Sequence, residues 1–198
     1  LKPTGIEDLI AMNALYRPGP VQFIDLFINR KHGREKVEYP HEKLEPILKD
    51  TYGIMVYQEQ IMQTAQILAG YSLGTADILR RAMGKKKMDV MEEQRVIFRD
   101  GCAKHNDIDG ETADKIFDVM MKFAEYGFNR SHSAAYSVVA FQTAYLKANY
   151  PAEYMASVLT HNMGDIKKVT FFMEECKRMG LAVLGPDVNE SAYKFAVN

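Results

Sequence analysis

Apolar residues recur at intervals of three and four positions along most of this chain, which is the spacing of helices that bury one face. Glycine, proline and capping residues separate these stretches, as expected at helix ends. The pattern predicts helices at about residues 6–16, 20–31, 44–48, 58–69, 73–84, 89–105, 111–126, 131–149, from 151, and 165–179. Two short strands are predicted at 181–183 and 193–197. We therefore expect a mainly α fold of many helices with a small αβ tail at its C-terminal end.

Two of these stretches predict most about the core. The stretch 111–126 has the clearest one-sided apolar pattern. The stretch 134–146 is apolar on most sides, which predicts a helix at the centre of the core. At the helix starts, Thr4 and Glu7 have the spacing of a capping box, and Ser131 or Ser133 is the expected cap of the long apolar helix.

Composition narrows the class of protein. With 198 residues and 47% hydrophobic content, the chain can fold around a sizeable core. Cys102 and Cys176 match no metal-binding spacing and suit a reducing compartment. Its apolar runs are too short for a membrane span, so we expect no membrane partner. The first residues do not form a targeting leader, and the missing initial methionine leads us to expect a piece of a longer protein.

The most basic stretch, residues 80–87, carries five positive charges, although the formal net charge of the chain is −1. Arg80 and Arg81 are predicted in the last helical turn before Gly84, and lysines follow in the connecting turn. Arginine can bind phosphate oxygens with two N–H groups, while lysine supplies a mobile charge. A triphosphate or a nucleic-acid backbone is therefore the expected partner, and a solvated basic turn is the simpler alternative.

A second polar stretch, residues 127–136, lies between two strongly apolar helices. It places Arg130, Ser131 and His132 at the predicted start of the second helix. Free amides at a helix N-terminus attract anions, so this arrangement predicts a phosphate site, with an ordinary helix cap as the alternative. Ser131 and His132 are adjacent, which argues against a serine-hydrolase pair.

Motifs for metal binding and nucleotide hydrolysis are lacking. The sequence contains no Cys-x-x-Cys and no His-Glu-x-x-His, and Gly84 with its following lysines lacks the upstream glycine of a P-loop. We therefore expect no metal site and disfavour a small nucleotide hydrolase. The residues by themselves predict a helical module that binds phosphate-rich ligands, either nucleic acid or a nucleotide.

Seven short motifs follow one another along the chain. They are ALYRPGP at 14–20, YGI at 52–54, YQEQ at 57–60, LRRAMGKKK at 79–87, GFNRSHSAAY at 127–136, YPAE at 150–153 and PDVN at 186–189. Together, and in this order, they resemble the C-family replicative DNA polymerases of bacteria over essentially the whole chain. Each motif is weak alone, but the set is specific. Arg130 stands where lysine is common in that family, which keeps the charge.

The resemblance implies that the chain is a fingers region, with a helical palm margin at 1–36, a helical fingers domain at 37–180 and a β tail at 181–198. Fingers of this family bind the incoming deoxynucleoside triphosphate and contact primer–template DNA. The residues that this assigns to the triphosphate are Arg80, Arg81, Lys85, Arg130, Ser131 and His132. Further candidate contacts to DNA or nucleotide are Arg17, Gln58, Lys86, Lys87 and Tyr136.

The resemblance also implies nucleotidyl transfer with Mg²⁺ held by residues outside this chain. The chain then contains no catalytic residue, and we expect it to be inactive by itself. The sliding clamp and other replisome subunits would bind elsewhere in the polymerase, and the expected compartment is the bacterial cytoplasm. The alternative function is a non-catalytic helical nucleic-acid-binding module.

Overall fold

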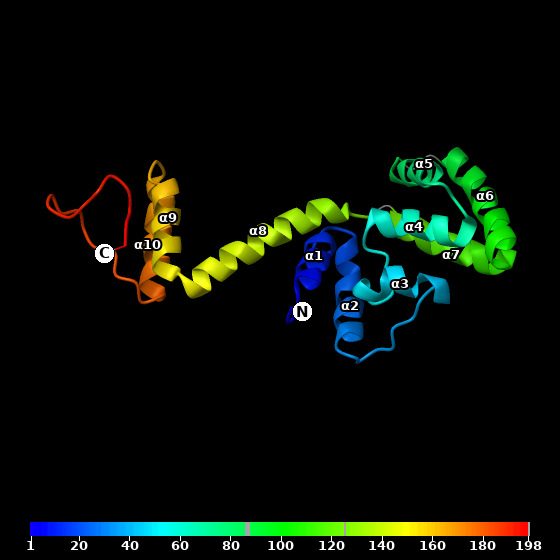
Figure 1. Cartoon of the computed structure of the whole chain (residues 1–198), viewed down its shortest axis with the longest axis horizontal. Coiled ribbons are helices and arrows are strands. Elements are labelled where there is room, and N and C mark those ends of the chain that lie inside the picture. The colour runs from blue at the N-terminus through cyan, green and yellow to red at the C-terminus, as the bar shows by residue number, and fades with distance from the viewer. Residues whose placement is uncertain (86–87, 125, 198) are drawn as a thin grey trace. The chain divides into compact units, whose positions relative to one another are not determined.

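A computed structural model describes residues 1–85, 88–124 and 126–197 and divides the chain into two compact units, Leu1–Ser137 and Val138–Asn198. Its α-helices are α1 (Ile6–Leu15), α2 (Ile24–Lys31), α3 (Glu45–Leu48), α4 (Gln58–Ala69), α5 (Leu73–Gly84), α6 (Met88–Asn106), α7 (Gly110–Ala124), α8 (Arg130–Asn149), α9 (Pro151–His161) and α10 (Ile166–Arg178) (Figure 1). Short 3₁₀ turns are η1 (Pro20–Phe23), η2 (Glu42–Leu44) and η3 (Lys49–Thr51). The predicted mainly α class is confirmed. The domain bounds expected from the sequence stay predictions.

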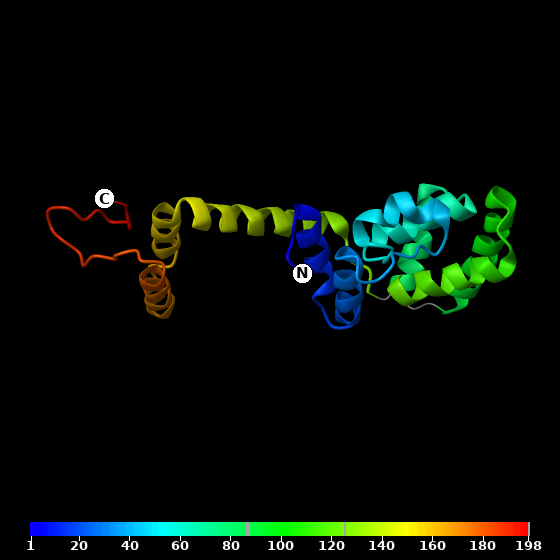
Figure 2. The same ribbon diagram turned by 90° about the horizontal axis from the view of Figure 1, so that it is seen from below.

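The larger core of the first unit lies among α4, α5, α6 and α7, which pack together in both views (Figures 1 and 2). Phe98 on α6 and Phe117 on α7 are fully buried, with ring centroids 5.5 Å apart. The one-sided pattern expected of residues 111–126 is confirmed, because Ile116, Phe117 and Met120 all face this core. Gly101 lets α6 approach α4 closely: a Cβ there would lie 2.3 Å from the carbonyl oxygen of Ala69.

A smaller core joins α1 and α2 to the extended segment at residues 54–57. Phe27 on α2 packs edge-on against Tyr52, with ring centroids 5.0 Å apart. The capping box expected from Thr4 and Glu7 is wrong. Gly5 is the cap residue of α1, and the Asp8 carboxylate accepts hydrogen bonds from the amide and the hydroxyl of Thr4. Asp8 also pairs with the buried cation Lys31. This pairing favours Asp8 over Glu7 as the acidic residue that contacts the start of α1.

The segment before α4 is extended and makes one parallel bridge, between Tyr57 and Phe128. Gln60 fixes this segment from inside the protein. Its Oε1 accepts from the amides of Val56 and Tyr57 at 2.8 and 3.0 Å, and its Nε2 donates to the hydroxyl of Thr51 at 2.8 Å. Through these hydrogen bonds the side chain of Gln60 holds the start of α4 against both the extended segment and the η3 turn.

The second unit contains α9 and α10, which lie side by side (Figure 2). Met155, Leu159 and Cys176 form its small core. The expected αβ tail is not confirmed, because the described residues 181–197 form no strand. The Phe195 amide donates to the side chain of Thr160 instead of to a neighbouring strand. A lone pair of short strands with no third strand to join is marginally stable at best.

Helix α8 does not lie at the centre of the core, so that prediction was wrong. Its buried residues are Ser133 and Ser137, while Val139, Phe141 and Tyr145 are more than half exposed. An apolar pattern shows what a helix is able to bury, whereas its actual burial depends on which partners are present. None of the described helices is long and apolar enough to cross a membrane.

The first prediction concerns the buried pair between Asp8 and Lys31, whose charged atoms lie 2.7 Å apart with side chains only 8% and 5% exposed. Replacing Asp8 with Ala should lower the free energy of unfolding by about 3 kcal/mol, because it leaves the Lys31 ammonium buried without a counter-ion. Asp25→Ala is the control: Asp25 is exposed in the first turn of α2 and should cost less than about 1 kcal/mol. Urea unfolding at pH 7 measures both.

The contribution of Asp8 has a definite pH dependence. Burial opposes its ionisation, but hydrogen bonds from Lys31 and Thr4 outweigh burial, so the pKa of Asp8 lies below its usual 3.8. A carboxyl whose pKa is lowered by folding stabilises the fold fully above its ordinary pKa, and this stabilisation is lost as the pH falls through the lowered value. A cost for Asp8→Ala no larger than that for Asp25→Ala at pH 7 would contradict the role of the pair.

Candidate functional site

Arg80 and Arg81, in the last turns of α5, are both paired with one carboxylate. Asp77 accepts from Nε and a terminal nitrogen of Arg80 at 2.9 and 2.7 Å, and its other oxygen lies 2.7 Å from Nε of Arg81. The hydrogen bond from Arg80 and the charges of both arginines hold the pKa of Asp77 below its usual range. Adjacent side chains on a helix point about 100° apart, and here Asp77 draws both guanidinium groups to one side of α5.

The lysines of the basic stretch are only partly covered by the structure. Lys85 is exposed at the C-terminal cap of α5, where its amide donates to the carbonyl of Arg81. A cation at this position is favoured by the partial negative charge of the helix end. Lys86 and Lys87, which the resemblance also singled out, lie outside the described residues.

The start of α8 is capped by Asn129, and the expected serine caps are wrong. The Oδ1 atom of Asn129 accepts from the amide of His132 at 2.8 Å, and the helix begins at Arg130. Ser131 is exposed. Ser133 is fully buried, and its hydroxyl donates to the carbonyl of Ile10 on α1 at 2.6 Å. Asn caps a helix about as well as Ser, and Ser133 instead joins α8 to α1.

The first amide of this helix already has an anionic partner. Both oxygens of Glu59 on α4 lie 3.1 Å from the amide nitrogen of Arg130, and one accepts from Nδ2 of Asn129 at 2.9 Å. A carboxylate at a helix N-terminus is favoured by the helix dipole and by the free amides. The position at which the sequence predicts a phosphate is therefore filled by a side chain of the protein itself.

The guanidinium of Arg130 lies between acidic side chains and an aromatic ring. It donates to Glu7 at 2.8 Å, lies 4.0 Å from Asp50, and sits 5.6 Å from the ring centre of Tyr57. The hydrogen bond to Glu7 raises the pKa of Arg130. Burial raises the pKa of the Tyr57 hydroxyl, which keeps that ring neutral. Arg130 is 44% exposed, so its charge remains accessible to solvent.

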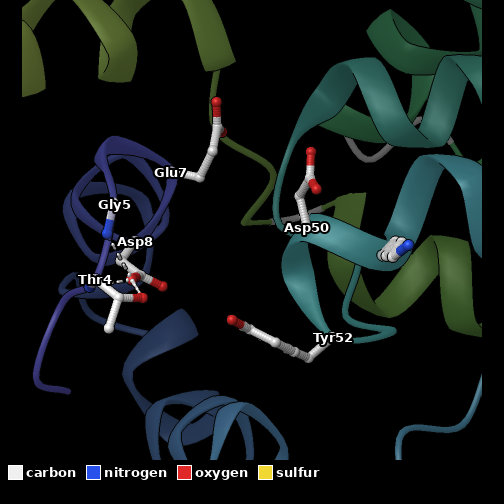
Figure 3. Close-up of a pocket in the computed structure, with 7 residues that line it drawn as sticks. Thr4, Gly5, Glu7, Asp8, Asp50 and Tyr52 are labelled. Atoms are coloured by element: carbon white, nitrogen blue, oxygen red, sulfur yellow. Dashed lines mark hydrogen bonds between the residues drawn. The ribbon is translucent and has the colours of Figure 1, made fainter.

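Glu7 and Asp50 also line a shallow pocket of about 330 Å³, together with Thr4, Gly5, Asp8, Lys49 and Tyr52. Figure 3 shows Glu7 and Asp50 on opposite sides of this pocket, one carried by α1 and the other by η3. Three of the seven lining residues are acidic and one is basic, which makes the pocket a poor receptor for phosphate. The positive charge lies instead on Arg130, which pairs with Glu7 and lies near Asp50.

Four further side chains, of which Phe128 is half-buried, form a row beside the start of α8. The guanidinium of Arg17 lies 4.7 Å from the ring centre of Phe128. The His132 ring lies 5.5 Å from Phe128 and 4.8 Å from Tyr136. Tyr136 is 62% exposed. Arg17, His132 and Tyr136, which the resemblance selected from two motifs more than 100 residues apart, are thus brought into one row.

The first two residues of α4 connect the two basic stretches. The Gln58 amide donates to the carbonyl of Phe128 at 3.0 Å, and its Oε1 accepts from Arg80 at 3.2 Å. Its neighbour Glu59 binds the start of α8, as described above. The structure therefore attaches Arg80 and the segment that carries Arg130 to the same helical turn.

Sequence reasoning missed the acidic partners of these cations. Asp77 precedes the two arginines by three and four positions, a spacing that places side chains together on a helix, so this pairing was readable from the sequence. Glu7 and Glu59 lie 123 and 71 residues from Arg130. No local pattern connects residues so far apart, and only the fold brings them together.

The described residues do not fit a magnesium site. No three His, Cys, Asp or Glu side chains among them are grouped so that they could hold a metal ion. The closely spaced acids Asp107 and Asp109 are no exception, because both oxygens of Asp109 accept hydrogen bonds from Thr112 at the start of α7. We therefore derive no chemical step through a metal held by this chain.

Comparison with known proteins identifies the protein family to which this helical domain belongs. A family model described as the bacterial DNA polymerase III alpha subunit finger domain matches residues 1–106, which is more than half of the chain. The chain therefore belongs to the family of bacterial DNA polymerase III alpha subunits, as a finger domain.

Its relatives include DNA polymerase III alpha subunits from several bacteria. The chain is 56% identical over 205 residues to DNA polymerase III subunit alpha of Vibrio cholerae and to that of Escherichia coli K12. It is 52% identical over 197 residues to the subunit of Bacillus subtilis. Each match covers the whole chain but only 18% of the relative. The chain thus corresponds to a small part of each of these polymerases.

Two buried serines on α8 give a matched test of how this helix is anchored. Ser133→Ala removes the hydrogen bond to Ile10 and should lower the free energy of unfolding by about 1 kcal/mol. Ser137 lies one turn further on, and its buried hydroxyl has no hydrogen-bond partner among the described residues. Ser137→Ala should therefore change stability by less than about 0.5 kcal/mol or increase it. Thermal or urea unfolding of both variants measures the difference, and equal effects would contradict the anchoring role of Ser133.

Proposed function

We propose that this chain binds the incoming deoxynucleoside triphosphate and primer–template DNA as the fingers region of a bacterial replicative DNA polymerase. The observation that carries the proposal is the first turn of α4, where Gln58 contacts Arg80 and Glu59 contacts the start of α8. A triphosphate carries charge on three groups and needs donors from more than one direction. The two basic stretches supply such donors from two different helices.

In this proposal the chain positions and neutralises the nucleotide and does not itself carry out the chemistry. Arg80, Arg81, Lys85 and Arg130 supply positive charge, and Ser131 and His132 supply further polar groups. Fixed donors stabilise the charge that develops during phosphoryl transfer without having to reorganise. Mg²⁺ supplies charge neutralisation to such reactions, and its ligands belong to parts of the polymerase outside this chain. The clamp and other replisome contacts, and the bacterial cytoplasm as compartment, belong to the same proposal.

A second function, a non-catalytic helical nucleic-acid-binding module, is favoured by one observation. The row of Arg17, Phe128, His132 and Tyr136 offers ring faces and a cation. Unpaired bases stack on such side chains with little regard to sequence. This function predicts binding to nucleic acid that does not depend on a triphosphate.

The role of the arginines is testable in a full-length alpha subunit that carries this sequence. Arg81→Ala or Arg130→Ala should reduce the efficiency of nucleotide incorporation, by about 1.5–3 kcal/mol in transition-state stabilisation for each charged hydrogen bond lost. Single-nucleotide primer extension measures the effect. Binding of primer–template DNA in the absence of nucleotide should change much less.

Arg34→Ala provides a matched control for this experiment. Arg34 is an exposed arginine in the turn after α2 and belongs to neither basic stretch, so its loss should leave incorporation nearly unchanged. If Arg81→Ala and Arg130→Ala weaken DNA binding as much as they slow incorporation, the assignment to the nucleotide is wrong.

The two candidate functions differ in how the chain responds to nucleotides and salt. A fingers domain should prefer a deoxynucleoside triphosphate to the corresponding monophosphate, whereas a nucleic-acid-binding module should not distinguish them. Binding of primer–template DNA should weaken as salt is added. The logarithm of the binding constant should fall with the logarithm of the salt concentration, with a slope of about −0.9 for each phosphate neutralised. Fluorescence titrations at several salt concentrations measure both. Equal affinity for the two nucleotides would support the alternative function, and DNA affinity independent of salt would contradict both.

A further inference from the structure

Glu59, the second residue of α4, is not among the residues proposed to bind the nucleotide or DNA. Its carboxylate accepts from two donors at the start of α8, the amide of Arg130 and the side chain of Asn129. It is partly buried, and it lies between the two basic stretches. It therefore determines where α8 begins, although it is not itself a phosphate-binding group.

Three neighbouring contacts make this attachment rigid. Phe128 donates its amide to the carbonyl of Val56 and accepts from the amide of Gln58, at 3.2 and 3.0 Å. Gly127 packs closely against Gln58, since a Cβ at position 127 would lie 3.2 Å from Cγ of Gln58. The segment 127–130 thus lies along the start of α4, and the bonds to Glu59 close its C-terminal side.

Loss of the Glu59 carboxylate would free the residues that it holds at the start of α8. The amide of Arg130 and the side chain of Asn129 would lose their shared acceptor. Asn129 also caps α8 through the amide of His132, so its displacement would loosen the first helical turn. Arg130 and His132 would then lose their fixed position relative to Arg80, which Gln58 holds from the adjacent position on α4.

We infer that Glu59 is a positioning residue for the nucleotide: it acts through Asn129 and Arg130 and fixes the second basic stretch relative to the first. The inference rests on the proposed function. It predicts that Glu59 affects nucleotide use only as long as Arg130 is present. A merely structural residue would instead lower the stability of the whole domain and would affect DNA and nucleotide binding together.

The test uses a full-length alpha subunit that carries this sequence. Glu59→Gln keeps the shape of the side chain and one acceptor oxygen but removes the charge. It should raise the KM for the deoxynucleoside triphosphate about 10-fold, with a smaller change in kcat and an unchanged Kd for primer–template DNA. Glu59→Asp restores the charge on a shorter side chain and should recover part of the loss. Glu111→Gln is the charge-matched control, because Glu111 is 80% exposed on α7 and pairs with Lys115, away from both basic stretches.

A double-mutant cycle with Arg130→Ala separates the possible outcomes. Residues that act through one another have non-additive effects, so Glu59→Gln should have little further effect on KM once Arg130 is replaced. Fully additive effects, or no effect of Glu59→Gln on KM, would overturn the inference while Arg130→Ala still supports the proposed function. If Arg130→Ala itself leaves incorporation unchanged, the proposed function fails. A similar fall in melting temperature, DNA affinity and nucleotide affinity for Glu59→Gln would show a structural role only and would also overturn the inference.

Discussion

The attachment of residues 127–130 to the start of α4 is the contact on which the rest of the candidate site depends. It consists of a short parallel backbone contact between Tyr57 and Phe128, closed on one side by Glu59 and supported from inside by Gln60. Backbone hydrogen bonds between segments 70 residues apart fix both position and direction. This contact holds the residues with which α8 begins, and Arg80 reaches the same turn of α4 through Gln58.

Three arginines of the site have carboxylate partners within the chain. Asp77 pairs with Arg80 and Arg81, and Glu7 pairs with Arg130, in positions that are 30% or more exposed. Exposed ion pairs of this kind contribute little to stability. Their effect is to hold each guanidinium in one orientation and to lower its repulsion from its neighbours. In the proposed function, a triphosphate, which carries more charge than a carboxylate, competes for the same N–H groups.

Helices with one apolar face were predictable from the sequence, because a helix that buries one face has apolar residues at intervals of three and four positions, as in α7 around Phe117. The candidate triphosphate residues were selected through motifs and stay predictions, although Arg80 and the amide of Arg130 both contact the first turn of α4. What could not be predicted depends on distant partners. Asn129 rather than a serine caps α8 because Glu59 fixes it from another helix. The exposed face of α8 around Phe141 looked like core because composition does not reveal which surfaces are present to cover it.

The central claim is that the two basic stretches respond to one ligand. Hydrogen–deuterium exchange of a full-length alpha subunit carrying this sequence, titrated with a deoxynucleoside triphosphate in the presence of primer–template DNA, tests it directly. The account predicts slower amide exchange in residues 79–85 and in residues 127–133, with the same apparent Kd for both. Protection of only one stretch, or protection of the two at clearly different nucleotide concentrations, would contradict it.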